Sequence, residues 1–221
     1  MFQDESSRKK AEEANGWLRN FFAGEDVFIL GGGKSADELS RQTISKLKKA
    51  RTIVLNKKIE LIENPSILMT LDEGLGDSIG KPGNWPYGEP YKVLAGPLSR
   101  MVPMDNVYRF QQCHDLISRN PAYLLCDHLG LAAINAAMIG KAKRIFLVGV
   151  DCGYGLLSKS GPAPLMNDPA LRAFRKYARS IPLFRKFAKF ENLYRVTDKT
   201  NLDFLPFMDL EVALAVAGKK N

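Results

Sequence analysis

Short runs of hydrophobic residues alternate along this chain with segments that have a helical pattern. The clearest runs are 27–30, 51–55, 67–71 and 144–150, and their length and branched side chains are typical of buried strands. Weaker strands are expected at 91–94, 106–110 and 193–196. Because strands that alternate with helices form parallel sheets covered on both faces, the pattern predicts an α/β fold.

The helical segments divide the rest of the chain. We expect an N-terminal helix within residues 1–25, followed by a single α/β domain over 26–221. A helix from Ser35 to about Ala50 would begin with a capping box formed by Ser35 and Glu38. Further helices are expected at 130–140 and 210–217. Residues 74–90 are rich in glycine and proline and predict an irregular loop.

Composition narrows the classes of protein. No apolar run approaches the roughly 20 residues of a membrane span, and the charged N-terminus has no signal-peptide pattern, so we expect a cytoplasmic protein without a membrane span. The cysteines Cys113, Cys126 and Cys152 form no CxxC pair, which argues against a disulfide framework or a cysteine zinc site. The net charge of +8 favours anionic partners.

One segment, 168–190, concentrates the positive charge. It is expected to form an amphipathic helix pair broken at Pro182, and no acidic residue occurs between 172 and 189. Two interpretations stay open: arginines that simply face water, or a surface that binds a polyanion or a membrane. The candidate polyanion-binding residues are Arg172, Arg175, Lys176, Arg179, Arg185 and Lys186.

A glycine turn follows the first strand directly and gives the strongest candidate for chemistry. It reads Gly31, Gly32, Gly33, Lys34, Ser35. It is not a Walker A loop, because Phe28 occupies the position of that motif's first glycine. As a dinucleotide fingerprint it would have alanine at the third glycine position, which alanine can fill. Its amide groups and the Lys34 ammonium predict phosphate binding.

Other candidates follow the remaining strands, where parallel sheets bind ligands. Asp72 and Glu73 could hold Mg²⁺ through nucleotide phosphates, or could be a solvated loop pair. Asp151 could contact a ribose, a metal or, as a general base, an acceptor. His128, next to Asp127, is either a catalytic acid or base or a structural cap.

The order of several sequence blocks resembles a known family. The blocks are VFILGGGKSADEL, RTIVLNKKIEL, SILMTLDEG, GLAAINAAMIGKAKRIFLVGVD and LYRVTDKTNLDFLPFMDLEVAL. Together they resemble the archaeal 6-hydroxymethylpterin diphosphokinase-like family, which includes many phage-encoded members, and they are similar to bacterial lipooligosaccharide sialyltransferases. The resemblance covers roughly residues 27–74 and 126–213. It implies a Rossmann-like fold, and for a phage-encoded protein the host-cell cytoplasm.

The resemblance also implies a nucleotide site. By match, the nucleotide would lie among Gly31 to Ser35, Asn56, and Asp127 to Gly130, although Lys34 replaces a proline that is usual in the family. The implied function is a nucleotide-dependent transferase, favoured as a glycosyltransferase with a nucleotide-sugar donor. The positive net charge favours an acidic glycan or nucleic acid as acceptor. The alternatives are an ATP- and Mg²⁺-dependent pyrophosphokinase and a non-catalytic protein that binds nucleotides or nucleic acid.

Overall fold

The computed structural model describes residues 5–71, 75, 92–95, 107–113, 117–125, 128–154 and 169–217. Within this part of the chain, a seven-stranded sheet has the strand order β5-β4-β3-β2-β1-β8-β9, and every neighbouring pair is parallel. Its strands are β1 (Asp26–Leu30), β2 (Arg51–Leu55), β3 (Ile67–Thr70), β4 (Lys92–Ala95), β5 (Val107–Arg109), β8 (Arg144–Val148) and β9 (Leu193–Arg195). The predicted α/β, Rossmann-like fold is confirmed.

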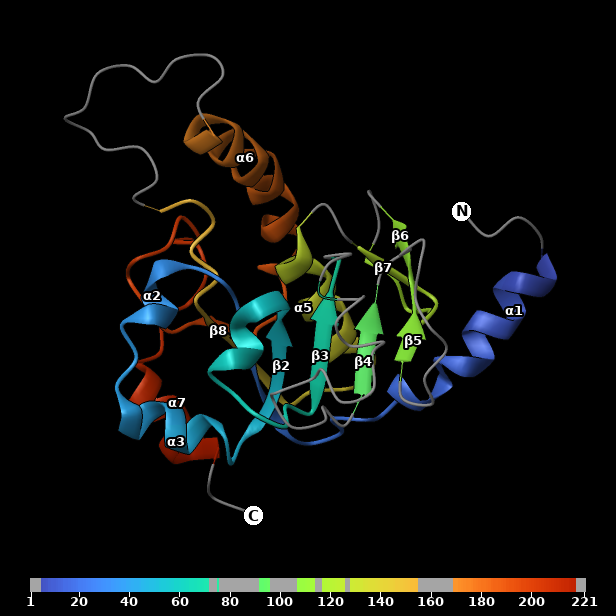
Figure 1. Ribbon diagram of the computed structural model, residues 1–221, viewed down its shortest axis with the longest axis horizontal. Helices are drawn as coiled ribbons and strands as arrows, with labels where there is room; N and C mark the ends of the chain where they lie inside the picture. Colours follow the sequence, from blue (N-terminus) through green and yellow to red (C-terminus); the bar gives the residue numbers. More distant parts are fainter. Residues whose placement is uncertain are drawn as a thin grey trace.

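The strand order reverses beside β1. The chain moves outward from β1 through β2 to β5, and then returns to place β8 on the other side of β1 (Figure 1). Because all strands are parallel, their carboxyl ends share one edge of the sheet, at the top of Figure 1. Open parallel sheets bind ligands at the carboxyl edge where the strand order reverses. The gap between the ends of β1 and β8 is therefore the expected place for a site.

Hydrophobic layers cover both faces of the sheet. On one face, α5 (Leu129–Ile139) and α6 (Pro169–Phe187) pack against side chains such as Ile29 and Ile53. On the other face, α3 (Arg41–Leu47) and α7 (Leu210–Ala217) pack against Phe28 and Val54. Successive side chains of a strand point to opposite faces, so a central strand needs a hydrophobic residue at every position.

The segment after the glycine turn differs from the prediction. Instead of one helix to Ala50, it forms α2 (Lys34–Asp37) and α3, and Ser40 is the N-cap of α3. The Ser40 hydroxyl accepts a hydrogen bond from the Thr43 amide at 3.0 Å. The capping box at Ser35 was wrong because the Ser35 hydroxyl donates to Asp151 instead.

The basic segment also differs. The predicted helix pair is one helix, α6, which continues through Pro182. A proline in a helix removes one backbone hydrogen bond. Here tertiary packing outweighs that cost, because Ser180, Phe184 and Phe187 are buried beneath the helix on both sides of the proline.

Five further elements lie within the described residues. The N-terminal segment forms α1 (Glu5–Ala14) and the short helix η1 (Gly16–Leu18), and Asn56–Glu60 forms a second short helix, η2, directly after β2. A small parallel sheet of β6 (Gln111–Cys113) and β7 (Tyr123–Leu125) was not predicted. Among the described helices, none has the length and apolar character required to cross a bilayer. Apart from Leu75, the loop predicted at 74–90 lies outside the described residues.

Candidate functional site

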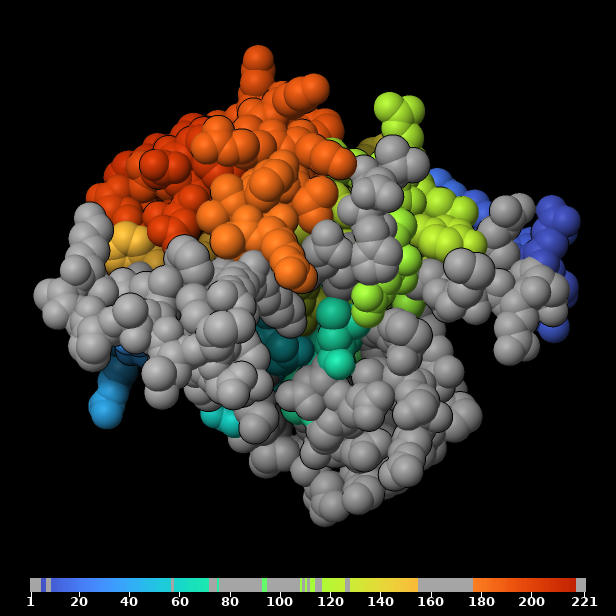
Figure 2. Space-filling model, turned by 90° about the horizontal axis from the view of Figure 1, so that it is seen from above, coloured from blue at the N-terminus to red at the C-terminus, as the bar shows by residue number. Residues whose placement is uncertain are grey.

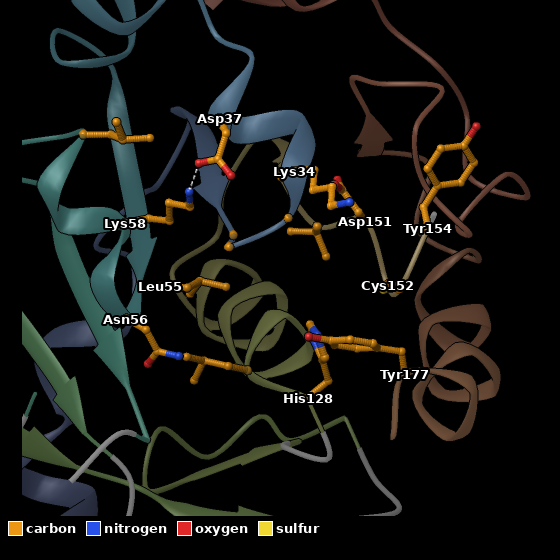
Figure 3. Close-up of a pocket in the computed structure, with 18 of the residues that line it drawn as sticks. Lys34, Asp37, Leu55, Asn56, Lys58, His128, Asp151, Cys152, Tyr154 and Tyr177 are labelled. Carbon is orange, nitrogen blue, oxygen red and sulfur yellow. Dashed lines mark hydrogen bonds and ion pairs between the residues drawn. The ribbon is translucent and has the colours of Figure 1, made fainter. Parts of the chain in front are cut away.

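A cavity of about 580 Å³ opens at the carboxyl edge where the strand order reverses. Figure 3 shows that its walls come from segments far apart in the sequence: the glycine turn and α2, the end of β2 with η2, the start of α5, the loop after β8, and α6. This volume lies within the range of small-molecule and cofactor sites. The polar lining residues are Lys34, Asp37, Asn56, Lys58, Glu60, His128, Asp151, Tyr154 and Tyr177.

The glycine turn is shaped by close contacts on one side and by open space on the other. A side chain at Gly31 would meet the Gly149 carbonyl oxygen at 2.5 Å, and one at Gly33 would meet the Asp151 carboxylate carbon at 2.3 Å. A side chain at Gly32 would meet no atom within 4 Å. Gly31 and Gly33 therefore allow the turn to pack against the loop after β8, and Gly32 faces the space available to a ligand.

Asp151 fastens this turn to the loop after β8. Its buried carboxylate accepts hydrogen bonds from the Ser35 amide at 2.9 Å and from the Ser35 hydroxyl at 2.5 Å. The start of a helix attracts an anion, and here the protein's own carboxylate occupies that place. Among the described residues, the amide groups of Gly32 and Lys34 have no hydrogen-bond partner and can still receive a ligand oxygen.

The loop after β8 is held in an unusual conformation from the opposite side. Cys152 has φ +50°, a left-handed conformation that is uncommon for a residue with a side chain. The side-chain amide of Asn201 donates to the Cys152 carbonyl at 3.0 Å, and the Thr200 hydroxyl donates to the Val150 carbonyl at 3.0 Å. Burial, reinforced by the charge of Asp151, raises the pKa of Cys152 to about 12. Its thiol is therefore protonated at neutral pH.

Asn56 lies at the end of β2, where the family resemblance had placed a nucleotide-binding asparagine. It also has a left-handed conformation, with φ +50°, which asparagine tolerates better than most residues. Its Oδ1 accepts a hydrogen bond from the Thr70 hydroxyl at 2.9 Å. This contact fixes the orientation of the amide, so that Nδ2 is presented to the cavity as a donor (Figure 3).

His128 is the N-cap of α5. Its Nδ1 accepts a hydrogen bond from the Gly130 amide at 3.0 Å, so a neutral ring carries its proton on Nε2. The ring makes edge contacts with Tyr177 and Phe184 of α6, with centroids 5.4 and 5.6 Å apart. His128 therefore links the start of α5 to α6 at the wall of the cavity, and in this state it can donate a hydrogen bond through Nε2 but cannot accept a proton there.

Several residues of the cavity were missed by the sequence analysis. Lys58 forms an ion pair with Asp37 across the cavity, and Tyr154 and Tyr177 line it on the side of β8 and α6. The signal for Lys58 was present, since it follows the singled-out Asn56 by two positions. Asp37 and Tyr177 had no local signal, because only the packing of α2 and α6 brings them to the cavity. Tyr154 lies in the segment 151–154 after β8, where the pattern of strand ends did predict a ligand site.

The structure brings together the glycine turn, Asn56, His128, Gly130 and Asp151. Asp72, Glu73 and Asp127 lie outside the described residues, and within the described part no cluster of three acidic, histidine or cysteine side chains could hold a metal ion. Of the predicted polyanion-binding residues, Arg179, Arg185 and Lys186 are exposed on α6, which Figure 2 shows in orange. The side chains of Arg172, Arg175 and Lys176 lie outside the described part.

Comparison with known proteins adds no assignment, since no protein-family model and no curated sequence matches this chain.

Proposed function

We propose that this protein is a nucleotide-dependent transferase whose donor nucleotide binds in the cavity between the ends of β1, β2 and β8. One observation carries the proposal: at the reversal of strand order, the glycine turn, Lys34, Lys58 and the Asn56 amide all line one cavity of about 580 Å³. The exposed Gly32 of the turn and two ammonium groups suit phosphates, while Asn56 and the nearby Leu55 and Leu61 suit the nucleoside.

The proposed chemistry depends on which acceptor atoms in the cavity already receive a hydrogen bond from the protein. Asp151 uses its carboxylate on Ser35, and His128 uses Nδ1 on Gly130. In this proposal both residues therefore hold the shape of the site. Lys34 and Lys58 act on the substrate by neutralising the charge that develops on the departing phosphate, and the cavity orients donor and acceptor. Transfer of a glycosyl group from a nucleotide-sugar is the favoured reaction. The bond between the sugar carbon and the phosphate oxygen breaks, an acceptor hydroxyl oxygen bonds to that carbon, and the departing phosphate takes the hydroxyl proton. Pyrophosphoryl transfer from ATP and Mg²⁺ is the alternative.

The proposal is tested by thermal unfolding with CMP, CDP, UDP, ADP, ATP and GTP, each with and without Mg²⁺. A ligand specific for the folded state adds about 2.7 kcal/mol at one hundred times its dissociation constant. We expect nucleotides of one particular base to stabilise the protein. Gly32→Val should abolish this stabilisation, because the new side chain enters the open space beside the turn. Stabilisation by a pyrimidine nucleotide would favour glycosyl transfer, and a requirement for ATP with Mg²⁺ would favour pyrophosphoryl transfer.

Gly16→Val is the matched control. A side chain at Gly16 also meets no atom within 4 Å, but this residue lies in η1, outside the cavity. It should leave nucleotide stabilisation unchanged. If no nucleotide stabilises the wild-type protein, or if Gly32→Val binds as well as Gly16→Val does, the proposed site is wrong.

A non-catalytic polyanion-binding protein is a second candidate, favoured by the exposed face of α6. Within the described part of the chain, Arg179 and Arg185 of α6 and Lys189, just after its end, are exposed and form no ion pair, whereas Lys46, Arg51 and Arg144 all do. If this face binds nucleic acid, replacing the three residues by glutamine should reduce the slope of log affinity against log salt by about 0.7–0.9 for each phosphate that is no longer neutralised. An unchanged slope would exclude this face.

A further inference from the structure

Lys58 and Asp37 form an ion pair that joins two walls of the cavity. Lys58 belongs to η2, after β2, and Asp37 belongs to α2, after β1, so the pair connects two neighbouring strand ends (Figure 3). The two partners differ in solvent exposure: 18% of the Lys58 side chain is exposed, against 62% for Asp37. The lysine is thus held largely inside the site, while its carboxylate partner faces water.

This difference makes the pair easy to exchange. An ion pair with a solvated carboxylate contributes little net free energy, because water can take the place of the lysine beside the carboxylate. If Lys58 turned from Asp37 to a phosphate oxygen of a ligand, Asp37 would become hydrated and Lys58 would keep an anionic partner. Charge-assisted hydrogen bonds to phosphate are among the stronger contacts of an ammonium group. A phosphate that reaches Lys58 would therefore displace Asp37.

Lys34 and Lys58 offer two separate places for a phosphate within one cavity. The two lysines come from different elements and lie on opposite sides of the glycine turn in Figure 3. A side chain at Gly32 would meet no atom within 4 Å, so the turn leaves open space in the cavity that both lysines line. A phosphate bound at the turn beside Lys34 would leave Lys58 with Asp37, whereas a second, linked phosphate would extend toward Lys58.

We propose that Lys58 is a specificity-determining residue that selects ligands with two linked phosphates, and that Asp37 holds it in place until such a ligand binds. This inference rests on the proposed nucleotide site and narrows its substrate class to nucleoside diphosphates and their esters. Asp37 competes with the second phosphate for Lys58, so its removal should favour diphosphates over monophosphates.

The test measures, by isothermal titration at fixed ionic strength, the affinities of AMP and ADP, CMP and CDP, GMP and GDP, and UMP and UDP. For the base that binds best, the wild type should prefer the diphosphate by about tenfold, the effect of one charge-assisted contact. Lys58→Gln should reduce that ratio to about one. Asp37→Asn should raise it several-fold.

Glu38→Gln is the matched control for Asp37→Asn. Glu38 follows Asp37 directly and also pairs with a lysine, Lys199, but neither Glu38 nor Lys199 lines the cavity. The control removes the same charge from the same place in the chain, and the diphosphate preference should stay unchanged. If Lys58→Gln does not fold, the comparison of Asp37→Asn with Glu38→Gln still decides the question.

Three results would overturn the inference: a wild type without diphosphate preference, an unchanged preference in folded Lys58→Gln, or equal effects of Asp37→Asn and Glu38→Gln. In each case nucleotide binding that is abolished in Gly32→Val would leave the proposed function intact. If no nucleotide of either kind binds to the wild type, the proposed function and this inference both fail.

Discussion

The contact between Ser35 and Asp151 should hold the glycine turn to the loop after β8, and a double-mutant cycle can measure it. Ser35→Ala removes the hydroxyl that donates to the carboxylate at 2.5 Å but keeps the amide that donates at 2.9 Å. Asp151→Asn keeps the volume of the side chain and removes its charge. A hydrogen bond to a charged group contributes about 1.5–3 kcal/mol and one between neutral groups about 0.5–1.5 kcal/mol. The asparagine keeps one acceptor oxygen, so we expect a coupling free energy equal to the difference, about 1 kcal/mol.

Urea unfolding of the wild type, the two single variants and the double variant gives the coupling directly. For a domain of this length each 1 kcal/mol shifts the melting temperature by about 2–4 °C, so Ser35→Ala alone should lower it by about 3–12 °C. Ser40→Ala is the control. Ser40 caps α3 through the Thr43 amide, and it has no contact with Asp151. Its effect, about 1 kcal/mol, should add to that of Asp151→Asn.

A coupling below about 0.5 kcal/mol between Ser35 and Asp151 would refute this reasoning, because the free-energy changes of two independent sites also add only to within that margin. The start of α2 would then not depend on the Asp151 carboxylate. The role of Asp151 in holding the glycine turn in place would have no support.

The glycine turn, Cys152 and Glu211 each give a further prediction. Gly31→Ala should cost about 1–3 kcal/mol in urea unfolding because its side chain would meet a backbone oxygen at 2.5 Å, whereas Gly32→Ala should stay within about 0.5 kcal/mol; equal costs would contradict the close contact. Cys152, with its pKa raised to about 12 by burial, has roughly one thiolate in ten thousand molecules at pH 8. Mass spectrometry should therefore find its alkylation by iodoacetamide slow in the native protein and fast in urea, and equal rates would show that it is not buried. Hydrogen bonds from Lys46 and Thr43 lower the pKa of Glu211 from its ordinary value of 4.5, so its contribution to stability is present above pH 4.5 and is lost as the pH falls through the lowered pKa. The melting temperature should fall more between pH 5 and pH 3 in the wild type than in Glu211→Gln, and parallel curves would contradict this assignment.

The sequence by itself determined the parts of the fold that depend on local pattern. The strands at 27–30, 51–55 and 144–150 could be predicted because a central parallel strand is buried on both faces and must be hydrophobic at nearly every position. The glycine turn could be recognised because close contacts at Gly31 and Gly33 exclude side chains. Since parallel strands end at one edge, the approximate meeting of Gly31 to Ser35, Asn56 and Asp151 could also be predicted.

Only the tertiary structure decided how these residues are used. The Ser35 hydroxyl could have capped its own helix, but the approach of β8 gives it the Asp151 carboxylate, from 116 positions away, as a stronger acceptor. Pro182 could have ended α6, but burial of Phe184 and Phe187 beneath it keeps the helix continuous. The partner of Lys58 depended on where α2 ends. In each case residues distant in sequence compete with a local preference, and their contacts form only when the sheet and helices pack.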